Sequence, residues 1–296
     1  MDVELRQLRA LVALADSGTF TDAAAELGLS QAAVSRSIQA LETGVGARLV
    51  HRTTRTVAFS PVGTELLTTA RRILDDLDRM VARARGETRG IRLGYAWAAL
   101  GAHTTPILRT WNREHPERPI RMVHAAQHDV GLRDGRADLA IVRHAMDEGE
   151  FESAPIGREA RVCTLAVDHP LAERATIGLA DLVGSRVGVD TATGTTSAAL
   201  WLDRGLAAPE IVPTQDTSEW LDLVAEGRIV GVTPVATEHY TPRPGVVFIP
   251  MPSAPTIQVR LAWPRGRRPA ETDQVLRHLR AYYRGADAPS RVGGGA

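Results

Sequence analysis

The chain contains no lysine. Arginine supplies all of its 35 basic residues, 35 aspartates and glutamates balance them, and the formal net charge is zero. The basic excess that marks many nucleic-acid-binding proteins is therefore absent. Residues 1–63 are also balanced, with six arginines against six acidic residues. Any contact with a polyanion must come from a small local patch.

Cysteine is almost as scarce, since Cys163 is the only one. A single cysteine excludes a disulfide framework or a cysteine-rich metal site within one chain. Cys163 stands in an apolar run, 161–167, that is typical of a buried strand, so we expect a small core residue. A redox-sensing role is the alternative, and the lack of a second cysteine argues against it.

Long apolar runs and a leader pattern are absent as well. The acidic start at residues 1–4 does not have the layout of a signal peptide. No apolar run approaches the ~20 residues that a membrane helix needs. We expect a cytoplasmic protein.

Two short helical patterns joined by a tight turn lie between Thr19 and Glu42. The first ends at Gly28, and Ser30 is a suitable N-cap for the second. One face of the second helix is apolar, and the other carries amide, hydroxyl and guanidinium groups. This is the layout of a helix-turn-helix, whose second helix reads bases in the major groove. The base-reading candidates are Ser30, Gln31, Ala32, Ser35, Arg36 and Gln39.

A β-ribbon with a basic tip is expected next, at 49–59. An ordinary amphipathic helix pair would explain the two helices alone, but a winged helix-turn-helix has all these parts in this order. Three wing residues complete the DNA-binding candidates, and the two arginines among them suit phosphate contacts. They are Arg52, Thr53 and Arg55.

The stretch from Leu5 to Gly63 resembles the DNA-binding domain of the LysR-type transcriptional regulators. The matching positions include 5–8, 18–21, 23–24, 30–36, 41–42, 48–49 and 52–53. The match is imperfect, because Ala32 replaces a usual proline, Val50 a usual phenylalanine, and Phe59-Ser60 a usual Leu-Thr. Alanine is tolerated in a first helical turn, so the reading face is unaffected.

A long helix is expected from Pro61 to about Glu87, and its apolar residues alternate by four and three positions. The stripe consists of Leu66, Ala70, Ile73, Leu77, Met80 and Ala84. Charged flanks leave this stripe narrow, which favours pairing with a second copy of the same helix. The family resemblance implies the same, a linker helix that pairs two subunits. Packing on its own domain is the alternative.

Strands alternate with helices after residue 90, which predicts a mostly parallel sheet. The expected strands are 91–95, 119–124, 138–143, 161–167, 187–189, 211–213, 229–232, 246–249 and 258–263. The expected helices are 104–114, 130–135, 195–204, 217–226 and 271–283. This order resembles the effector domain of the same family, which has two α/β lobes built like a periplasmic binding protein and joined by two crossovers.

The expected fold is therefore an α/β effector domain of two lobes with an N-terminal all-α winged helix-turn-helix domain and a linker helix. The domain boundaries follow from the pattern and the resemblance. They are 1–60 for the DNA-binding domain, 61–88 for the linker, 91–285 for the effector domain and 286–296 for a disordered tail. Lobe one is expected at 91–161 and 266–285, and lobe two at 162–265.

Ligands in open α/β sheets lie outside the carboxyl ends of strands, often over helix N-termini. The residues at such turns are Trp97, Ala98, His144, Thr191, Thr193, Thr195 and Thr233. The hydroxyl-rich run 191–196 could hold a carboxylate, although plain N-capping explains it equally well. Trp97 stands where the family often has a hydroxyl residue, which favours a flat, apolar or aromatic effector.

No catalytic or metal-binding spacing stands out, and we expect no enzyme activity, no cofactor and no metal. The sequence predicts a transcriptional regulator that binds a pseudo-palindromic operator as a homodimer or homotetramer and answers to a small molecule. RNA polymerase is a further partner to consider. The rival hypothesis is a two-lobe binding protein or enzyme whose N-terminal helices serve assembly only.

Overall fold

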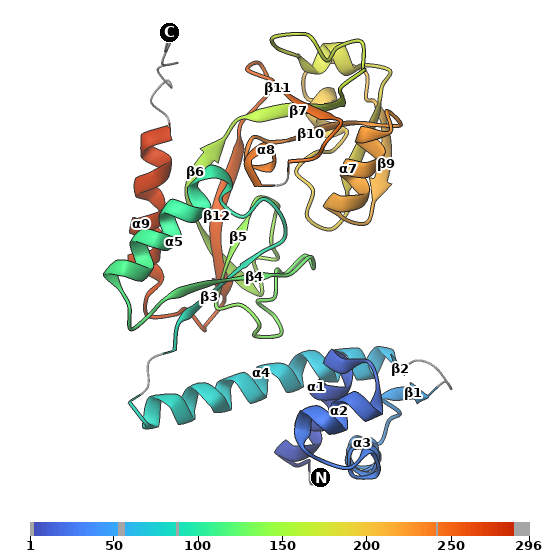
Figure 1. Cartoon of the computed structure of the whole chain (residues 1–296), viewed down its shortest axis with the longest axis vertical. Helices are drawn as coiled ribbons and strands as arrows, with labels where there is room; N and C mark the ends of the chain where they lie inside the picture. The colour runs from blue at the N-terminus through green and yellow to red at the C-terminus, as the bar shows by residue number, and fades with distance from the viewer. Residues whose placement is uncertain (1–2, 53–56, 87–88, 241, 287–296) are drawn as a thin grey trace. The chain divides into compact units, whose positions relative to one another are not determined.

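The computed structural model of the chain describes residues 3–52, 57–86, 89–240 and 242–286 (Figure 1). The chain divides into two compact units. Unit one comprises Met1–Arg89 with the short segment Arg133–Arg136, and unit two comprises the remainder. Over the described ranges, no helix is both long enough and apolar enough to cross a membrane.

Three helices open unit one, and their ends follow the capping residues of the sequence. They are α1 (Leu5–Ser17), α2 (Phe20–Leu27) and α3 (Gln31–Val45). Gly28 ends α2 with a left-handed φ of 65°, where residues with a Cβ are disfavoured. The side chain of Thr19 accepts a hydrogen bond from the N–H of Asp22, and Ser30 accepts one from Ala33. The expected helix-turn-helix is therefore present.

A two-stranded ribbon follows α3. Strand β1 (Val50–Arg52) pairs antiparallel with β2 (Val57–Phe59). Glu42, on α3, connects this helix to the ribbon. Its carboxylate accepts hydrogen bonds from the N–H groups of Leu49 (2.8 Å) and Val50 (3.1 Å). Helix α3 and the ribbon are therefore joined through Glu42.

Helix α4 (Pro61–Ala84) does not present the expected stripe as one exposed seam. Ala70 is fully buried in the core of unit one, and Leu66 packs against that core. These two residues pack within their own unit, because they lie on the side of α4 that faces α1. Ile73 and Met80 remain exposed, at 41% and 60%.

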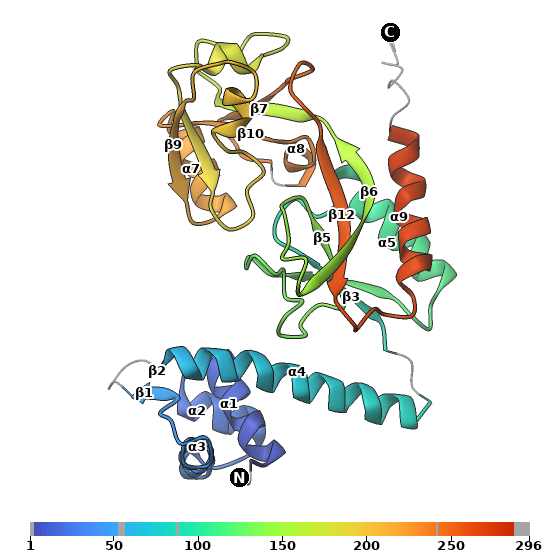
Figure 2. The same ribbon diagram turned by 180° about the vertical axis from the view of Figure 1, so that it is seen from behind.

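Unit two consists of two lobes, each built on a five-stranded sheet (Figures 1 and 2). Lobe one has the strand order β4-β3-β5-β12-β6. Its strands are β3 (Ile91–Tyr95), β4 (Ile120–His124), β5 (Leu139–Val142), β6 (Phe151–Glu159) and β12 (Ile257–Pro264). Figure 2 shows the long strands β6 and β12 side by side, and they pair antiparallel.

Lobe two has the strand order β11-β7-β10-β8-β9. Its strands are β7 (Arg161–Ala166), β8 (Arg186–Asp190), β9 (Glu210–Thr214), β10 (Val230–Pro234) and β11 (Val246–Pro250). In each lobe, two strand pairings are parallel and two are antiparallel. The prediction of a mostly parallel sheet was therefore wrong, because each lobe takes in the antiparallel strands that enter from the crossovers.

The lobe boundary also needs correction. The expected range of lobe two, 162–265, is too long, because β12 lies between β5 and β6 in the sheet of lobe one. The second crossover therefore precedes Ile257. Strand β6 and helix α8 (Ala236–Tyr240) were not expected from the sequence at all.

The helices of lobe one include α5 (Thr104–Glu114) and α9 (Thr272–Ala286). Buried residues of both, such as Trp111 and Leu279, form one core with the sheet. Lobe two carries α6 (Ala199–Leu202), α7 (Thr217–Ala225) and α8. The 3-10 turns Gly101–His103 and Leu179–Leu182 complete the described helical elements.

Two expected helices are absent or shortened. Residues 130–135 form turns, and Val130 has a φ of 52°, which an α-helix cannot accommodate. The expected helix 195–204 is reduced to α6. The backbone oxygen of Thr195 accepts a hydrogen bond from Arg161 and the Thr196 hydroxyl donates to Val232, so this segment is held to the sheet instead.

We predict that Glu42→Ala destabilises unit one by roughly 2 kcal/mol, because two backbone N–H groups lose a charged acceptor. Urea unfolding followed by circular dichroism at 222 nm measures the loss. All five tryptophans lie in unit two, so tryptophan fluorescence should be unchanged. Glu26→Ala, an exposed change on α2, is the matched control. Equal behaviour of the two variants would contradict the anchoring role of Glu42.

Candidate functional site

Helix α3 has two faces of different chemistry. Its buried face packs in the core of unit one and consists of Val34, Ile38 and Leu41. The opposite face carries the predicted base-reading residues Gln31, Ala32, Ser35, Arg36 and Gln39. All of these are exposed except Ser35, which is half-buried. Ser30 caps the helix and is exposed, so an amide- and guanidinium-bearing surface lies at the start of α3.

The predicted wing residues are only partly covered by the structure. Arg52 is the last residue of β1, where its backbone pairs with Val57. Thr53 and Arg55 lie outside the described residues. Arg48, which precedes the ribbon, is exposed and adds a described positive charge near α3.

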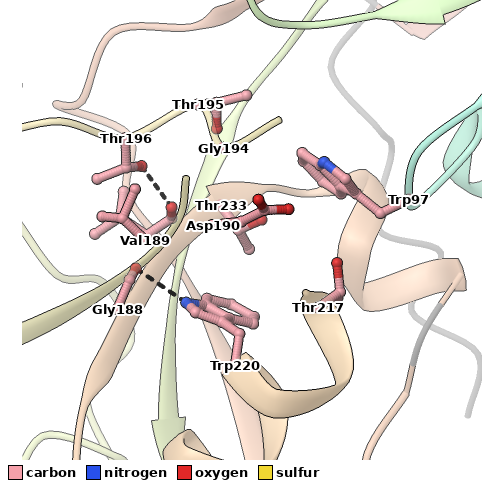
Figure 3. Close-up of a pocket in the computed structure, with 11 residues that line it drawn as sticks. Trp97, Gly188, Val189, Asp190, Gly194, Thr195, Thr196, Thr217, Trp220 and Thr233 are labelled. Carbon is pink, nitrogen blue, oxygen red and sulfur yellow. Dashed lines mark hydrogen bonds between the residues drawn. The ribbon is translucent and has the colours of Figure 1, made fainter. Parts of the chain in front are cut away.

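A pocket with about 370 Å³ of space, counted out to its open mouth, lies at strand ends of unit two (Figure 3). Its lining residues define the Trp97 pocket. They are Trp97, Gly188, Val189, Asp190, Gly194, Thr195, Thr196, Thr217, Trp220, Val232 and Thr233. Trp97 comes from lobe one and all the others from lobe two.

The loop that follows β8 is organised by Asp190. One oxygen of its carboxylate accepts hydrogen bonds from the N–H groups of Ala192 (2.8 Å) and Thr193 (3.2 Å), and the other accepts one from the Thr193 hydroxyl (2.9 Å). Gly194 closes the loop, since its N–H donates to the backbone oxygen of Asp190. The carboxylate is therefore held in place at the pocket wall.

Trp220, on α7, lies flat against the sheet of lobe two. Its indole N–H donates to the backbone oxygen of Gly188 (3.0 Å). A Cβ at Gly231 would lie 2.0 Å from the Trp220 ring, and one at Gly188 would lie 2.8 Å from it. The two glycines therefore make room for this aromatic wall, which Figure 3 shows on the side of the pocket away from Trp97.

Trp97 is half-buried and belongs to none of the hydrophobic cores of the described residues. The next two residues, Ala98 and Ala99, have φ values of 52° and 38°, which are strained for residues with a Cβ. The Arg143 guanidinium lies over the Trp97 ring, 5.3 Å from its centroid, at a distance typical of a cation–π contact. Trp97 is thus positioned by the loop and by Arg143.

Arg143 is itself held by a buried ion pair with Glu159 at the end of β6. The closest N–O distance is 2.8 Å, and the side chains are 3% and 6% exposed. The Tyr283 hydroxyl donates to the same carboxylate (2.8 Å). Burial alone would lower the pKa of Arg143, but Glu159 outweighs burial and raises it. The pair stands where the chain leaves lobe one.

Arg161 stands on the other side of this crossover and has no ion pair among the described residues. Its guanidinium donates to the backbone oxygens of Pro255 (3.0 Å) and Thr195 (2.8 Å) and to the Thr196 hydroxyl (3.2 Å). Burial lowers the pKa of Arg161 to about 10, and the nearby charge of Arg204 adds to this. Arg161 therefore stays charged at neutral pH.

The structure brings together three of the predicted effector residues, Trp97, Thr195 and Thr233. The other four do not line the pocket. Ala98 is fully buried, Thr191 is exposed, and Thr193 is buried with its hydroxyl bonded to Asp190. His144 packs on His128, 4.5 Å between ring centroids.

Asp190, Thr217 and Trp220 were missed by sequence reasoning. Asp190 directly follows the expected strand 187–189 and opens a turn at the strand end, but it was not named among the effector residues. Trp220 is harder to predict from the sequence, because only the glycines at 188 and 231 indicate that an aromatic ring packs against the sheet.

Cys163 is fully buried in β7. Burial, with a smaller effect of Asp181, raises the pKa of its thiol to about 12, so little reactive thiolate forms at neutral pH. The thiol therefore behaves as a packing group. Among the described residues, no group of three or more His, Cys, Asp or Glu side chains is arranged to hold a metal ion.

Two family models match the chain. Residues 5–64 match the bacterial regulatory helix-turn-helix proteins of the lysR family, and residues 84–284 match the LysR substrate binding domain. Together they include α3, the wing and the Trp97 pocket.

Individual proteins agree with these matches. The chain is 30% identical to the Hca operon transcriptional activator HcaR of Escherichia coli over 92% of its own length and 96% of that protein. It is 34% identical to the HTH-type transcriptional regulator YnfL of Escherichia coli over 62% of its own length, and the match spans 64% of YnfL. The crystal structure of CbnR, a LysR family transcriptional regulator, shares the fold with a TM-score of 0.72 at 23% identity, covering 94% of this chain and 98% of that one.

We predict that Glu159→Gln lowers the stability of unit two by about 3–5 kcal/mol, because Arg143 remains buried without its counter-charge. Unfolding in urea, followed by tryptophan fluorescence, measures this. Glu210→Gln is the control, since its ion pair with Arg186 (3.0 Å) is 49% and 62% exposed, and such pairs contribute at most about 1 kcal/mol. Similar losses in both variants would mean that the buried Glu159–Arg143 pair contributes no more to stability than an exposed ion pair.

Proposed function

The chain belongs to the LysR family of transcriptional regulators, and we propose that it binds a pseudo-palindromic operator as a homodimer and responds to a small molecule held in the Trp97 pocket. The DNA-binding candidates remain those named from the sequence, with Arg52, Thr53 and Arg55 on the wing. We place this activity in the cytoplasm.

The observation that carries the proposal is the exposed polar face of α3. Gln31 and Arg36 have side chains suited to bidentate pairing with adenine and guanine, and the small Ala32 beside them allows close approach to a thymine methyl. A helix used only for assembly would carry apolar groups on its outer face. The outer face of α3 is instead amide, hydroxyl and guanidinium groups, so base reading is the better interpretation.

A single unit offers few positive charges to DNA. Arg36 and Arg48 are the exposed arginines of the described residues between α3 and the wing. Phosphate contacts supply much of the affinity for DNA, so one copy should bind weakly. Two copies would double the patch and match the symmetry of a pseudo-palindrome.

Helix α4 is the element we assign to pairing. Ile73 and Met80 are exposed apolar residues on one side of this long, charged helix, and Leu77 is half-buried beside them. Covering such side chains with a second copy removes apolar surface from water. Leu66 and Ala70, already packed in their own unit, are left out of this interface.

A bound effector can alter transcription only if it favours one arrangement of the protein over another. The Trp97 pocket suits this role, because lobe one supplies Trp97 and lobe two supplies Thr195 and Thr233. A ligand that touches all three bridges the lobes and stabilises the arrangement in which they approach. That bias is the signal we propose.

We predict that Arg36→Ala loses about 1–3 kcal/mol of discrimination between operator and unrelated DNA, the usual worth of one bidentate base contact. Fluorescence anisotropy with the DNA upstream of its own gene, against an unrelated duplex, measures the ratio. Arg121→Ala is the control, since it removes one exposed arginine from β4 in unit two. An unchanged ratio in Arg36→Ala would remove Arg36 from the reading face.

The double variant Ile73→Asp/Met80→Asp should be monomeric, because two charges enter an apolar contact that cannot solvate them. Light scattering gives the mass, and operator affinity should fall with it. Leu202→Asp is the control, a charge placed on an apolar residue of unit two that is 58% exposed. If the double variant stays dimeric, the subunits pair through another surface.

A further inference from the structure

The ionisable charge at the surface of the Trp97 pocket is negative. Asp190 is the one ionisable side chain among the described lining residues of the Trp97 pocket. We propose that the pocket takes a flat ligand that carries a protonated amine, with the amine on Asp190 and the flat part against Trp97. This deepens the proposed function and rests on it.

The Asp190 carboxylate is both fixed and uncompensated. Its hydrogen bonds come from Ala192 and Thr193, which are neutral, and no cation pairs with it among the described residues. The oxygen bonded to the Thr193 hydroxyl has one such bond, and a carboxylate oxygen can accept two. A ligand ammonium would therefore find an oriented acceptor with no internal cation to displace.

The two aromatic walls favour the same class of ligand. In the view of Figure 3, Asp190 and Thr233 lie between the rings of Trp97 and Trp220. Aromatic faces attract cations, and tryptophan does so most strongly. Arg143 already illustrates the attraction at Trp97. A flat ligand gains contact with the rings, and its positive charge is favoured by them.

The nearby positive charges do not reach the pocket surface. Arg143 is engaged by Glu159 and by the backbone oxygen of Ala99. Arg161 donates to the backbone oxygen of Thr195 and to the hydroxyl of Thr196. Neither Arg143 nor Arg161 lines the pocket. His144 lies close enough to Asp190 to feel its charge, but burial lowers the pKa of His144, so it is mainly neutral at pH 7.

An anionic ligand would consequently meet a carboxylate at contact and the arginines only through the wall. The hydroxyls of Thr217 and Thr233 are neutral and suit either class. The Thr233 hydroxyl is already bonded to that of Thr237 (2.8 Å). Asp190 is therefore the residue that decides the sign of the ligand charge.

The test uses matched amine and acid pairs on the full-length protein: tryptamine with indole-3-acetate, phenethylamine with phenylacetate, and benzylamine with benzoate. Isothermal titration calorimetry gives each Kd. We expect at least one amine to bind, at least about tenfold tighter than its acid, as a charge-assisted hydrogen bond predicts. Binding by no amine, or tighter binding by the acids, overturns the proposal.

Asp190→Asn then assigns the preference. Asparagine keeps an oxygen for the N–H groups of Ala192 and Thr193, so the loop should persist. We expect the amine to lose at least about tenfold in affinity and the acid to lose none. Asp203→Asn, an exposed change of equal charge after α6, should alter neither. An amine that binds Asp190→Asn and the parent equally well also overturns the proposal.

Trp97→Leu provides a second measurement that does not depend on the Asp190 loop. It should weaken the bound amine, and an unchanged affinity would remove the ring from the site. Operator binding is measured separately by gel shift without ligand. Failure there would reject the proposed function, whereas failure of the amine preference with intact operator binding rejects only the ligand class.

Discussion

The ion pair between Glu159 and Arg143 is the constraint on which the architecture of unit two depends. Two charges are taken out of water at the point where the chain leaves lobe one, and such burial costs several kcal/mol per ion unless the geometry is good. The Glu159 carboxylate forms the ion pair with Arg143 and accepts a hydrogen bond from the Tyr283 hydroxyl. Arg143 in turn lies over the ring of Trp97. The lobe-one wall of the Trp97 pocket is therefore supported by the same ion pair that lies at the crossover.

The second buried arginine, Arg161, contacts both crossovers. Arg161 starts β7 at the first crossover, and it donates to Pro255, just before β12, at the second. It also holds the loop of Thr195 and Thr196, which lines the pocket. One guanidinium thus connects both crossovers to one wall of the Trp97 pocket. Movement of a lobe about the crossovers must therefore move or deform this wall of the Trp97 pocket.

Local chemistry made much of this fold predictable. The hydroxyl caps and glycines of unit one set its helix ends, and α5 and α7 follow helical periodicity within one residue of expectation. Predictions failed where distant contacts decide. Strand β12 joins lobe one because it pairs with β5 and β6, a pairing that no local pattern encodes. Likewise Ala70 looked like a dimer contact, since an apolar stripe does not say which partner will cover it.

The residues of the Trp97 pocket divide in the same way into predictable and unpredictable ones. Strand-end reasoning named Trp97, Thr195 and Thr233, and these three line the pocket, because their positions depend on the order of strands and helices along the chain. It did not identify the contribution of α7, whose Trp220 reaches the pocket through packing against paired glycines. It also overrated His144, which is occupied by His128. The spacing of residues along the chain does not show whether a side chain is already hydrogen-bonded to its own loop or to a neighbouring residue.

The outer strands of the two sheets of unit two bear on assembly. The outer strands are β4 and β6 in lobe one and β11 and β9 in lobe two. Pro155, Pro213 and Pro250 lie within β6, β9 and β11, and Pro119 directly precedes β4. Proline lacks the N–H that an added strand would need, so open edges blunted in this way resist strand-to-strand aggregation. The prolines of the outer strands therefore disfavour edge-to-edge pairing of the sheets of unit two.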